Sequence, residues 1–431
     1  MPEGGLALAP PRSYTGLAMV IETRGRRRRG KYSGPYRPGQ MLRLALGQMT
    51  NRGRCLAHTG DGLAVFVAYG LPGEEVVAEV ERAYREHLEA HVVEVLTPAP
   101  ERVEPLCPYF GACGGCNFQH MPYERQLELK REVVVETLRR IGRFDDVPVP
   151  PAIASPQAWF YRNQARFSTN REGAIGFTRR GSHRVERIEI CYIMEPAIRD
   201  LMPQLQGHGA GLHQIVVRTG VNTGELLINP DLSDRGVTVP SGQDWMTERV
   251  EGQPFDISGS AFFQVNTRQA ENMVRLVRER LQLGPDDVLA DLYAGVGFFS
   301  KLLAPNCREV VAVEVSKAAA DNARRNLAGV ENVRYQLGDV EKVLPFLVQR
   351  PNKVLLDPSR EGCTPAAVDA ILAVAPQRIV YVSCDAATLA RDLRRMVDGG
   401  CTLHEVQPLD MFPQTFHIEC IATLTRGKGE G

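Results

Sequence analysis

Ten cysteines are the first candidates for chemistry in this chain of 431 residues. Three of them, Cys107, Cys113 and Cys116, lie in one short loop with the pattern Cys-x5-Cys-x2-Cys. Glycines between the last two let the three thiolates converge, and Cys191 is the candidate for a fourth ligand. Four cysteines can hold zinc or an iron–sulfur cluster, although a zinc ribbon more often shows two short Cys-x2-Cys pairs. The spacing therefore predicts a metal centre, with zinc and unligated thiols as the alternatives to an iron–sulfur cluster.

Cys384 is a candidate nucleophile because of its place between two predicted elements. It ends the apolar run RIVYVSC (378–384) and precedes DAATLARDLRR (385–395), which is typical of a helix. A thiol at a helix N-terminus has a lowered pKa and a larger fraction of reactive thiolate. The alternative is a buried thiol that packs as a small hydrophobic side chain, and the neighbouring Asp385 would oppose a thiolate. Core packing is the role we predict for Cys55, Cys307, Cys363, Cys401 and Cys420.

The C-terminal part alternates predicted strands and helices, which is the pattern of a parallel sheet in an α/β domain. Its first strand, VLADLY (288–293), leads into a turn that contains Gly295 and Gly297. Because open α/β sheets bind ligands at the carboxyl ends of their strands, polar residues at these ends predict one site. An acid near the second strand suits the ribose of NAD or of S-adenosylmethionine equally, but Ser300 replaces the third glycine of the dinucleotide fingerprint. The polar residues that end the later strands are Glu314, Asp339, Asp357 and Cys384.

The chain divides into four predicted regions. Residues 1–40 are rich in Gly, Pro and Arg without hydrophobic periodicity, which predicts a disordered basic tail. Residues 41–100 contain short apolar or alternating runs, the pattern of a small β-barrel related to oligonucleotide-binding folds. Residues 101–250 hold the cysteine loop, a predicted amphipathic helix at 122–142 and strand-like runs. Residues 251–431 form the predicted α/β domain.

Charge is balanced over the whole chain but concentrated in two segments. Lys and Arg number 51, as do Asp and Glu, so the net charge is zero. Residues 1–50 carry nine basic and two acidic residues, and residues 161–187 carry seven basic and two acidic residues. In the second segment arginines alternate with aromatic residues, a combination that can bind phosphates and stack on unpaired bases. A solvated strand face is the alternative to this predicted RNA contact.

The sequence shows no run with the length and apolarity of a membrane-spanning helix and no evident signal peptide. We therefore expect a cytoplasmic protein, whose cysteines are metal ligands, nucleophiles or buried thiols rather than disulfides. An exposed RNA-binding surface favours a monomer.

Several ordered motifs resemble those of one family, the RNA 5-methyluridine methyltransferases that use S-adenosylmethionine. The resemblance covers residues 41–431 and is greatest to the iron–sulfur branch that acts on bacterial 23S ribosomal RNA. In the N-terminal half, LPGEEV (71–76) and CPYFGACGGCNFQH (107–120) resemble the TRAM barrel and the cluster loop of that branch. The other motifs are SAFFQVN (260–266), DLYAGVGFFS (291–300), VVAVEVS (310–316), LLDPSR (355–360), VSCDAATLARDL (382–393) and DMFPQTFHIECIATL (410–424).

The resemblance implies a class I Rossmann-like methyltransferase domain, an N-terminal TRAM barrel and a central α+β domain that carries the cysteines. It implies S-adenosyl-L-methionine and a [4Fe-4S] cluster as cofactors and RNA as the partner. It also implies that Cys384 is the nucleophile and Glu419 the general base. The implied cofactor-binding residues are Gln264, Tyr293, Gly295, Gly297, Phe298, Glu314, Asp339 and Asp357, of which Gln264 and Asp357 are also candidates for contact with uracil. The implied cluster ligands are Cys107, Cys113, Cys116 and Cys191.

The implied reaction is methylation of carbon 5 of a uridine in 23S ribosomal RNA. Attack of the Cys384 thiolate on carbon 6 makes carbon 5 nucleophilic, and Glu419 removes the carbon 5 proton after methyl transfer. Because the target base has to leave its stack, we expect a uridine in a loop or bulge. The alternatives are the same chemistry on a tRNA T-loop uridine and a non-catalytic RNA-binding or assembly protein that keeps the fold. Bacterial tRNA enzymes of the family typically lack the barrel and the cysteines, which favours ribosomal RNA.

The chain departs from the usual family pattern without losing a proposed reacting group. Ser359 stands where a second proline is usual, and Asp385 and Ala386 stand where Asn-Pro is usual. Gln414 and Phe416 replace part of a His-rich stretch. Asp385 can still cap the following helix, so these departures bear on rate and on substrate choice.

Overall fold

The computed structural model describes residues 34–426. The predicted basic tail lies outside the described residues as far as residue 33. Its last residues belong to the barrel, because the Gly39 N–H donates to the Val80 carbonyl and the Val80 N–H donates to the Gln40 carbonyl. These hydrogen bonds extend the barrel to residues that precede Met41.

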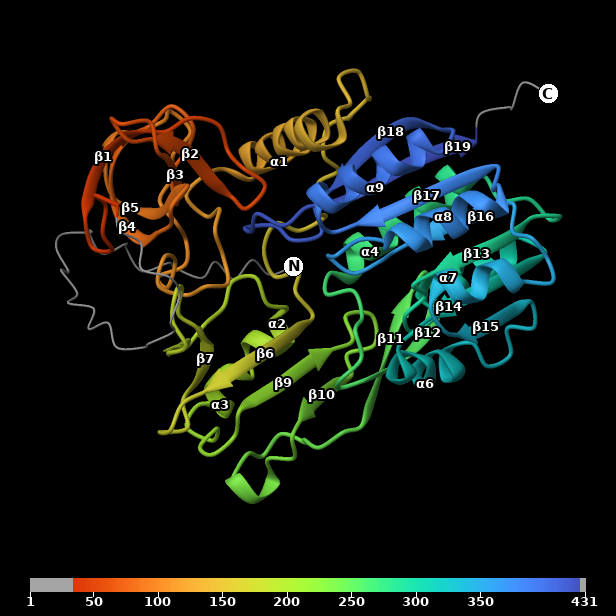
Figure 1. The fold of residues 1–431 in the computed structure, drawn as a ribbon. Helices are drawn as coiled ribbons and strands as arrows, with labels where there is room; N and C mark the ends of the chain where they lie inside the picture. Colours follow the sequence, from red (N-terminus) through yellow and green to blue (C-terminus); the bar gives the residue numbers. More distant parts are fainter. Residues whose placement is uncertain (1–33, 427–431) are drawn as a thin grey trace, which may run out of the picture. The chain divides into compact units, whose positions relative to one another are not determined.

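A five-stranded sheet of the predicted barrel type follows, with the strand order β1-β4-β5-β3-β2 (Figure 1). In β4 every second side chain is buried, the period of two that the sequence showed. Strand β2 was not among the predicted runs, because it is short and both of its ends, Arg54 and His58, are polar. The strands are β1 (Met41–Ala45), β2 (Arg54–His58), β3 (Ala64–Ala68), β4 (Glu75–Ala83) and β5 (His87–Thr97).

The central region contains the predicted helix and a second sheet. Helix α1 (Tyr123–Thr137) continues into a π-helical turn, Leu138–Gly142, so the prediction of a helix over 122–142 is confirmed in extent. The second sheet has the order β10-β9-β6-β7-β8 and is antiparallel throughout. Its strands are β6 (Gln164–Thr169), β7 (Ile175–Thr178), β8 (Val185–Arg187), β9 (Gln214–Thr219) and β10 (Leu226–Asn229), and the short helices α2 (Pro196–Arg199) and α3 (Met202–Leu205) lie between β8 and β9 in the chain.

A hairpin of β11 (Trp245–Val250) and β12 (Gln253–Ser258) leads into the C-terminal domain. Met246 and Phe255 of this hairpin belong to the same hydrophobic core as the helices of that domain. The domain boundary predicted between residues 250 and 251 falls in the hairpin turn, so this packed unit begins earlier than predicted.

The C-terminal domain is built on a seven-stranded sheet with the order β15-β14-β13-β16-β17-β19-β18. The first five strands in this order are parallel, and β19 and β18 are antiparallel to their neighbours. Alternate residues of β13, such as Leu289 and Ala290, enter two different hydrophobic cores, so both faces of the sheet are covered. The strands are β13 (Val288–Leu292), β14 (Glu309–Glu314), β15 (Val333–Leu337), β16 (Lys353–Leu356), β17 (Arg378–Ser383), β18 (Cys401–Leu409) and β19 (Glu419–Arg426).

Helices on the two faces complete this doubly wound α/β domain, as predicted (Figure 1). They are α4 (Thr267–Leu281), α5 (Phe298–Leu303), α6 (Lys317–Asn326), α7 (Val340–Val343), α8 (Pro365–Val374) and α9 (Ala386–Asp398). Within residues 34–426, none of the helices has the length and apolar character needed to cross a membrane.

The segment between β18 and β19, residues 410–418, is held by helix α1, and we call it the strap. The Lys130 ammonium lies 2.6 Å from an Asp410 carboxylate oxygen, and both side chains are almost fully buried. The side-chain amide of Gln126 donates to the Gln414 side chain at 3.0 Å and accepts from the Gln414 N–H at 2.9 Å. The strap leads directly into Glu419, so helix α1 helps to fix the start of β19.

Candidate active site

The turn after β13 brings backbone to the carboxyl edge of the parallel sheet. Tyr293, Gly295 and Gly297 all have positive φ angles, of 66°, 56° and 80°. A Cβ on Gly297 would lie 3.0 Å from Leu327, whereas a Cβ on Gly295 would have no atom within 4 Å. Gly297 thus allows close packing against Leu327 at the C-terminal end of α6, and Gly295 leaves open space where a ligand can approach the backbone.

Glu314 ties the ends of two neighbouring strands together beside this turn. Its carboxylate accepts a hydrogen bond from the Gly295 N–H at 3.0 Å and another from the Ser316 N–H at 2.7 Å. The Tyr335 hydroxyl donates to the Gly295 carbonyl at 2.8 Å. The predicted residues Gly295 and Glu314 are therefore brought together, with the second side chain held in place by backbone donors.

Two carboxyl groups lie under the same edge. Asp291 is fully buried, and the Ser300 hydroxyl donates to one of its oxygens at 2.5 Å. The other oxygen has no hydrogen-bond partner among the described residues. Desolvation raises the pKa of Asp291 to about 6. Desolvation, and then the charge of Asp291, raises the pKa of Asp357 to about 7.

The other three predicted cofactor residues are less close to the turn or point elsewhere. Asp339 precedes α7 and its carboxylate accepts from Lys342 at 2.6 Å. Gln264 lies between β12 and α4, where its backbone carbonyl accepts from Asn163 at 3.0 Å. The Phe298 ring packs into the core against the rings of Phe255, Phe263 and Phe299. Only the backbone of Phe298, at the start of α5, faces the turn region.

Cys384 follows β17 and precedes the N-cap of α9, as predicted. Asp385 caps this helix by accepting from the Ala387 and Thr388 N–H groups at 2.9 and 3.0 Å. The expectation of a lowered thiol pKa is wrong for this structure. Burial, followed by the nearby Glu419 carboxylate, raises the pKa of Cys384 to about 12, although Arg360 acts in the opposite direction. Desolvation and a like charge therefore outweigh the helix terminus.

Glu419 begins β19 and lies beside Cys384. The pairing of Ser383 with Cys420 places the two residues on adjoining strands, and Glu419 is only 6% exposed. Burial and then the Asp357 carboxyl raise its pKa well above the ordinary value, while Arg360 opposes this shift. A carboxyl group in this setting holds its proton strongly, and once ionised it is a strong base.

Arg360 and His417 are two further site residues that the sequence reasoning did not select. The charge of the Arg360 guanidinium acts on Cys384 and Glu419, and the guanidinium lies 3.2 Å from a ring nitrogen of His417. Burial, and then Arg360, lowers the pKa of His417 to about 3, so its ring is neutral and can accept from the guanidinium. The signal for Arg360 was its place at the end of the LLDPSR motif.

Helix α9 fixes the loop that carries Asp357 and Arg360. Its Asp392 carboxylate accepts from the Cys363 N–H and from the Tyr381 hydroxyl, both at 2.8 Å. The Thr388 hydroxyl donates to the Arg360 carbonyl at 3.1 Å. Because the same helix follows Cys384, the thiol and the guanidinium are positioned by one rigid element.

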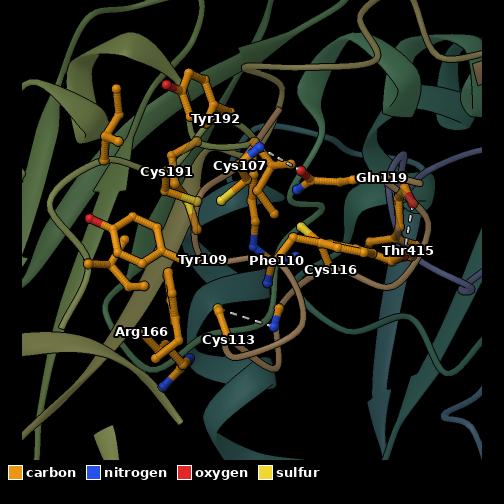
Figure 2. Close-up of a pocket in the computed structure, with 18 of the residues that line it drawn as sticks. Cys107, Tyr109, Phe110, Cys113, Cys116, Gln119, Arg166, Cys191, Tyr192 and Thr415 are labelled. Carbon is orange, nitrogen blue, oxygen red and sulfur yellow. Dashed lines mark hydrogen bonds between the residues drawn. The ribbon is translucent and has the colours of Figure 1, made fainter. Parts of the chain in front are cut away.

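The four predicted ligand cysteines line one cavity of about 370 Å³, which we call the cysteine cavity (Figure 2). The Gln119 side chain accepts from the Cys107 N–H at 3.1 Å, and the Gly115 N–H donates to the Cys113 sulfur at 3.4 Å. Burial raises the pKa of Cys113 to about 11 and that of Cys191 to about 12. Burial and then the charge of Cys191 also raise the pKa of Cys116. The four sulfurs therefore share a low-dielectric space in which burial disfavours the thiolate form.

The cysteine cavity adjoins the Cys384 site. Arg360 and His417 line it together with Arg162 and Arg166 from the predicted basic segment. Across the described part of the chain, no three Cys, His, Asp or Glu side chains are close enough together to hold a single metal ion.

Ion pairs occupy part of the predicted basic segment. Arg180 pairs with Glu81 of the barrel at 2.7 Å, and Arg187 pairs with Glu189 at 2.5 Å. Arg162 and Arg166 instead face the cysteine cavity. The segment is therefore partly a structural connection to the barrel and partly a basic wall beside the site.

Comparison with known families finds matches in both halves of the chain. A profile described as tRNA (Uracil-5-)-methyltransferase matches residues 238–338 and 347–427. A TRAM domain profile matches residues 36–93. An uncharacterized RNA methyltransferase of Gloeobacter violaceus is 34% identical, over 90% of this chain and 97% of its own length. One of Halalkalibacterium halodurans is 32% identical, over 91% of this chain and 99% of its own length.

A solved structure has the same fold over most of the chain. The Pyrococcus abyssi tRNA (uracil-54, C5)-methyltransferase, in complex with S-adenosyl-L-homocysteine, superimposes with a TM-score of 0.70 and 26% identity. The match covers 89% of this chain and 100% of that protein.

Proposed function

Because the chain belongs to the RNA uracil-5-methyltransferase family, we propose that it methylates carbon 5 of a uridine in 23S ribosomal RNA through a covalent adduct with Cys384. The observation that carries this proposal is the meeting of Cys384, Glu419, Asp357 and Arg360 at one edge of the sheet. The four side chains supply a nucleophile, a base and a cation within one water-poor site, which is the set that the reaction requires.

The residues around the glycine turn fit the cofactor. The open space beside Gly295 accommodates a ligand close to the backbone, and the unpartnered oxygen of Asp291 lies in the strand that leads into the turn. In our proposal Glu314 holds the ribose, and Asp339 lies near the adenine. S-adenosylmethionine, when bound, supplies an electrophilic methyl group. The chain's own part is to orient it against carbon 5 and to exclude water.

In the proposed first step the Cys384 sulfur forms a bond to carbon 6 of uracil. The thiol must first release its proton to solvent, and Arg360 stabilises the resulting thiolate. Electron density from the new bond moves to the ring as an enolate, which makes carbon 5 nucleophilic. Glu419 is protonated at this stage because its pKa is raised.

In the proposed last step Glu419 acts as the base. The enolate takes its methyl group at carbon 5 from the cofactor, when this is bound, and Glu419 releases its own proton to solvent. The resulting carboxylate then takes the proton from the methylated carbon 5. The electron pair of that C–H bond restores the double bond between carbons 5 and 6, and the sulfur leaves carbon 6 as the Cys384 thiolate. The high pKa that keeps Glu419 neutral at first also makes it an effective base here.

Both ribosomal RNA and tRNA are substrates consistent with the family. The barrel and the cysteine cavity support ribosomal RNA, following the resemblance noted from the sequence. A tRNA uridine is the second candidate, because the Pyrococcus abyssi protein of similar fold is a tRNA enzyme by its title.

Methyl transfer to separate transcripts decides between these substrates. Labelled S-adenosylmethionine is incubated with 23S ribosomal RNA and with tRNA, and the product nucleoside is mapped. We expect 5-methyluridine in ribosomal RNA alone. Label in tRNA alone would keep the chemistry and overturn the substrate, whereas label in neither RNA would overturn the whole proposal.

We also propose that the cysteine cavity holds a [4Fe-4S] cluster bound by Cys107, Cys113, Cys116 and Cys191. Support comes from the lining of one cavity by all four thiols. Methyl transfer moves no electrons between redox centres, so the role proposed for the cluster is to hold the cysteine loop beside Arg360.

A further inference from the structure

A second cavity, of about 700 Å³, lies between the barrel sheet and the C-terminal end of α1, and we call it the barrel cavity. Its size falls within the range of ligand pockets, and it contains none of the residues assigned above to catalysis or cofactor binding. Strands β2, β3 and β5 line one side, and the π-helical turn after α1 lines another. Single π-turns occur frequently at functional sites.

The barrel cavity has two basic side chains that form no ion pair within residues 34–426, although the charge of Arg140 also acts on Glu136 in the same lining. Arg52 and Arg140 are exposed, and neither side chain forms a hydrogen bond or an ion pair with a described residue. By contrast, Arg54 lies 3.4 Å from Glu89, and Arg180 pairs with Glu81 at 2.7 Å. The two unpaired guanidinium groups are therefore available for an anionic ligand.

Partly exposed rings line the barrel side of the same cavity. Phe66 on β3 and His87 on β5 have ring centroids 5.4 Å apart in an edge arrangement. His87 also stacks on Tyr84 at 4.6 Å, which fixes its ring plane. Rings held in this way on a small barrel present faces on which an unpaired base can stack.

Two adjacent rings, Phe416 and His417, connect the barrel cavity to the proposed active site. Phe416 of the strap lines the barrel cavity, and its ring centroid lies 4.1 Å from that of His417. His417 lines the cysteine cavity and contacts Arg360. When an RNA strand places one nucleotide at Cys384, a flanking nucleotide of the same strand can therefore reach the barrel cavity.

We propose that the barrel cavity binds an unpaired nucleotide that flanks the target uridine. Its base stacks on Phe66 beside His87, and its phosphates contact Arg52 and Arg140. This inference rests on the proposed function, because it takes the RNA substrate as the ligand. An acidic peptide would use the guanidinium groups but would leave the stacking faces without a role.

The binding test uses a fluorescein-labelled single-stranded RNA of about 16 nucleotides, near the upper site size of such barrels. Binding is followed by anisotropy at several salt concentrations for the wild type and for Arg52→Ser/Arg140→Ser. Each lost phosphate contact should reduce the slope of log affinity against log salt by about 0.7, so the double variant should lose about 1.4. The control is Arg43→Ser, an exposed barrel arginine that does not line the cavity and should leave the slope unchanged.

Stacking is tested with Phe66→Leu, which keeps an apolar side chain in the barrel but removes the ring. We expect KM for RNA in methyl transfer to rise about 5-fold or more, with kcat unchanged. An unchanged KM and salt slope would overturn the inference while leaving methyl transfer, and so the proposed function, intact. An equal loss of affinity for a fully paired duplex would also overturn it. If the wild type methylates no RNA, the anisotropy arm still decides whether the cavity binds an unpaired strand.

Discussion

At the scale of single residues, the surroundings of Cys384 keep its thiol protonated. Burial raises its pKa most, two carboxyl groups, Glu419 and Asp357, raise it further, and one guanidinium, Arg360, lowers it. With a pKa of about 12, the thiolate is a minor species at neutral pH. The nucleophile is thus protected from oxidation and alkylation, and it has to be activated within the substrate complex.

The separate effects of these charges on Cys384 can be measured from the rate at which its thiol is alkylated. Asp357→Asn removes a group that raises the thiol pKa, so it should speed alkylation of Cys384 by iodoacetamide in the absence of cofactor. Arg360→Met removes the opposing cation and should slow it. For the wild type the rate should rise about tenfold per pH unit below the pKa. Peptide mass spectrometry separates Cys384 from the other cysteines, and equal rates in the two variants would contradict this account of the site.

Glu419→Gln should trap the covalent intermediate. Glutamine cannot accept the carbon 5 proton, so the methylated RNA should remain attached to Cys384 and appear as a slower protein band in a denaturing gel. Cys384→Ala should abolish both methylation and the band while RNA binding persists, and Cys401→Ala, a buried cysteine on β18, should change neither. A Glu419→Gln enzyme that turns over at the wild-type rate would rule out the proposed base.

Glu419→Gln should block turnover, but it should stabilise the fold at high pH. The pKa of Glu419 is raised in the folded state. Its buried neutral carboxyl therefore contributes to the stability of the fold at low pH, and this contribution is lost as the pH rises through the folded-state pKa. Glutamine stays neutral at every pH. The Tm of Glu419→Gln should therefore exceed that of the wild type at pH 9 and approach it at pH 5. A lower Tm at both pH values would contradict the assigned direction of the shift.

At the scale of elements, the strap connects helix α1 to the proposed base. Lys130 and Asp410 form a buried pair at 2.6 Å, and Gln126 and Gln414 are joined by two hydrogen bonds. Gln414 is one of the departures from the usual family pattern, and the structure gives it a positioning role. The identity of these residues therefore bears on the orientation of Glu419.

Lys130→Met should destabilise the fold by about 3–5 kcal/mol, because it leaves the Asp410 carboxylate buried without its cation. Lys130→Met/Asp410→Leu should recover most of that loss in urea unfolding, since an apolar pair can replace a buried ion pair. If the ion pair positions the strap, kcat of the stable double variant should still fall, by up to about 10²-fold, with RNA affinity unchanged. Full kcat in that variant would show that the pair is only structural.

Local sequence patterns were sufficient to predict the elements but not the contacts between distant segments. The parallel strands, α1 and most barrel strands follow from periodicity, and the polar residues at strand ends follow from the geometry of the α/β sheet. The strap contacts could not be predicted, because their partners are 280 or more positions apart. The direction of the Cys384 pKa shift was missed for a related reason, since Glu419 comes from another strand.

At the scale of the whole molecule, the cysteine cavity joins the central region to the active site through Arg360 and His417. Loss of the proposed cluster should therefore loosen both the central region and the proposed active site. Cys191→Ser should abolish visible absorption from iron–thiolate charge transfer, lower the bound iron and sulfide, and reduce methyl transfer without abolishing it. Cys307→Ser, at a buried cysteine outside the cavity, is the control. Bound iron that remains at the wild-type level in Cys191→Ser would contradict the ligand assignment.

The long separation between Lys130 and Asp410 also has a consequence for protein synthesis. A ribosome that adds about 5–20 residues per second needs roughly 15–60 s to proceed from one residue to the other. During that interval α1 carries a lysine and a glutamine whose native partners have not yet been made. The nascent chain can form its barrel long before it can place Glu419, so a growing polypeptide remains unable to modify the RNA around it until the strap has emerged.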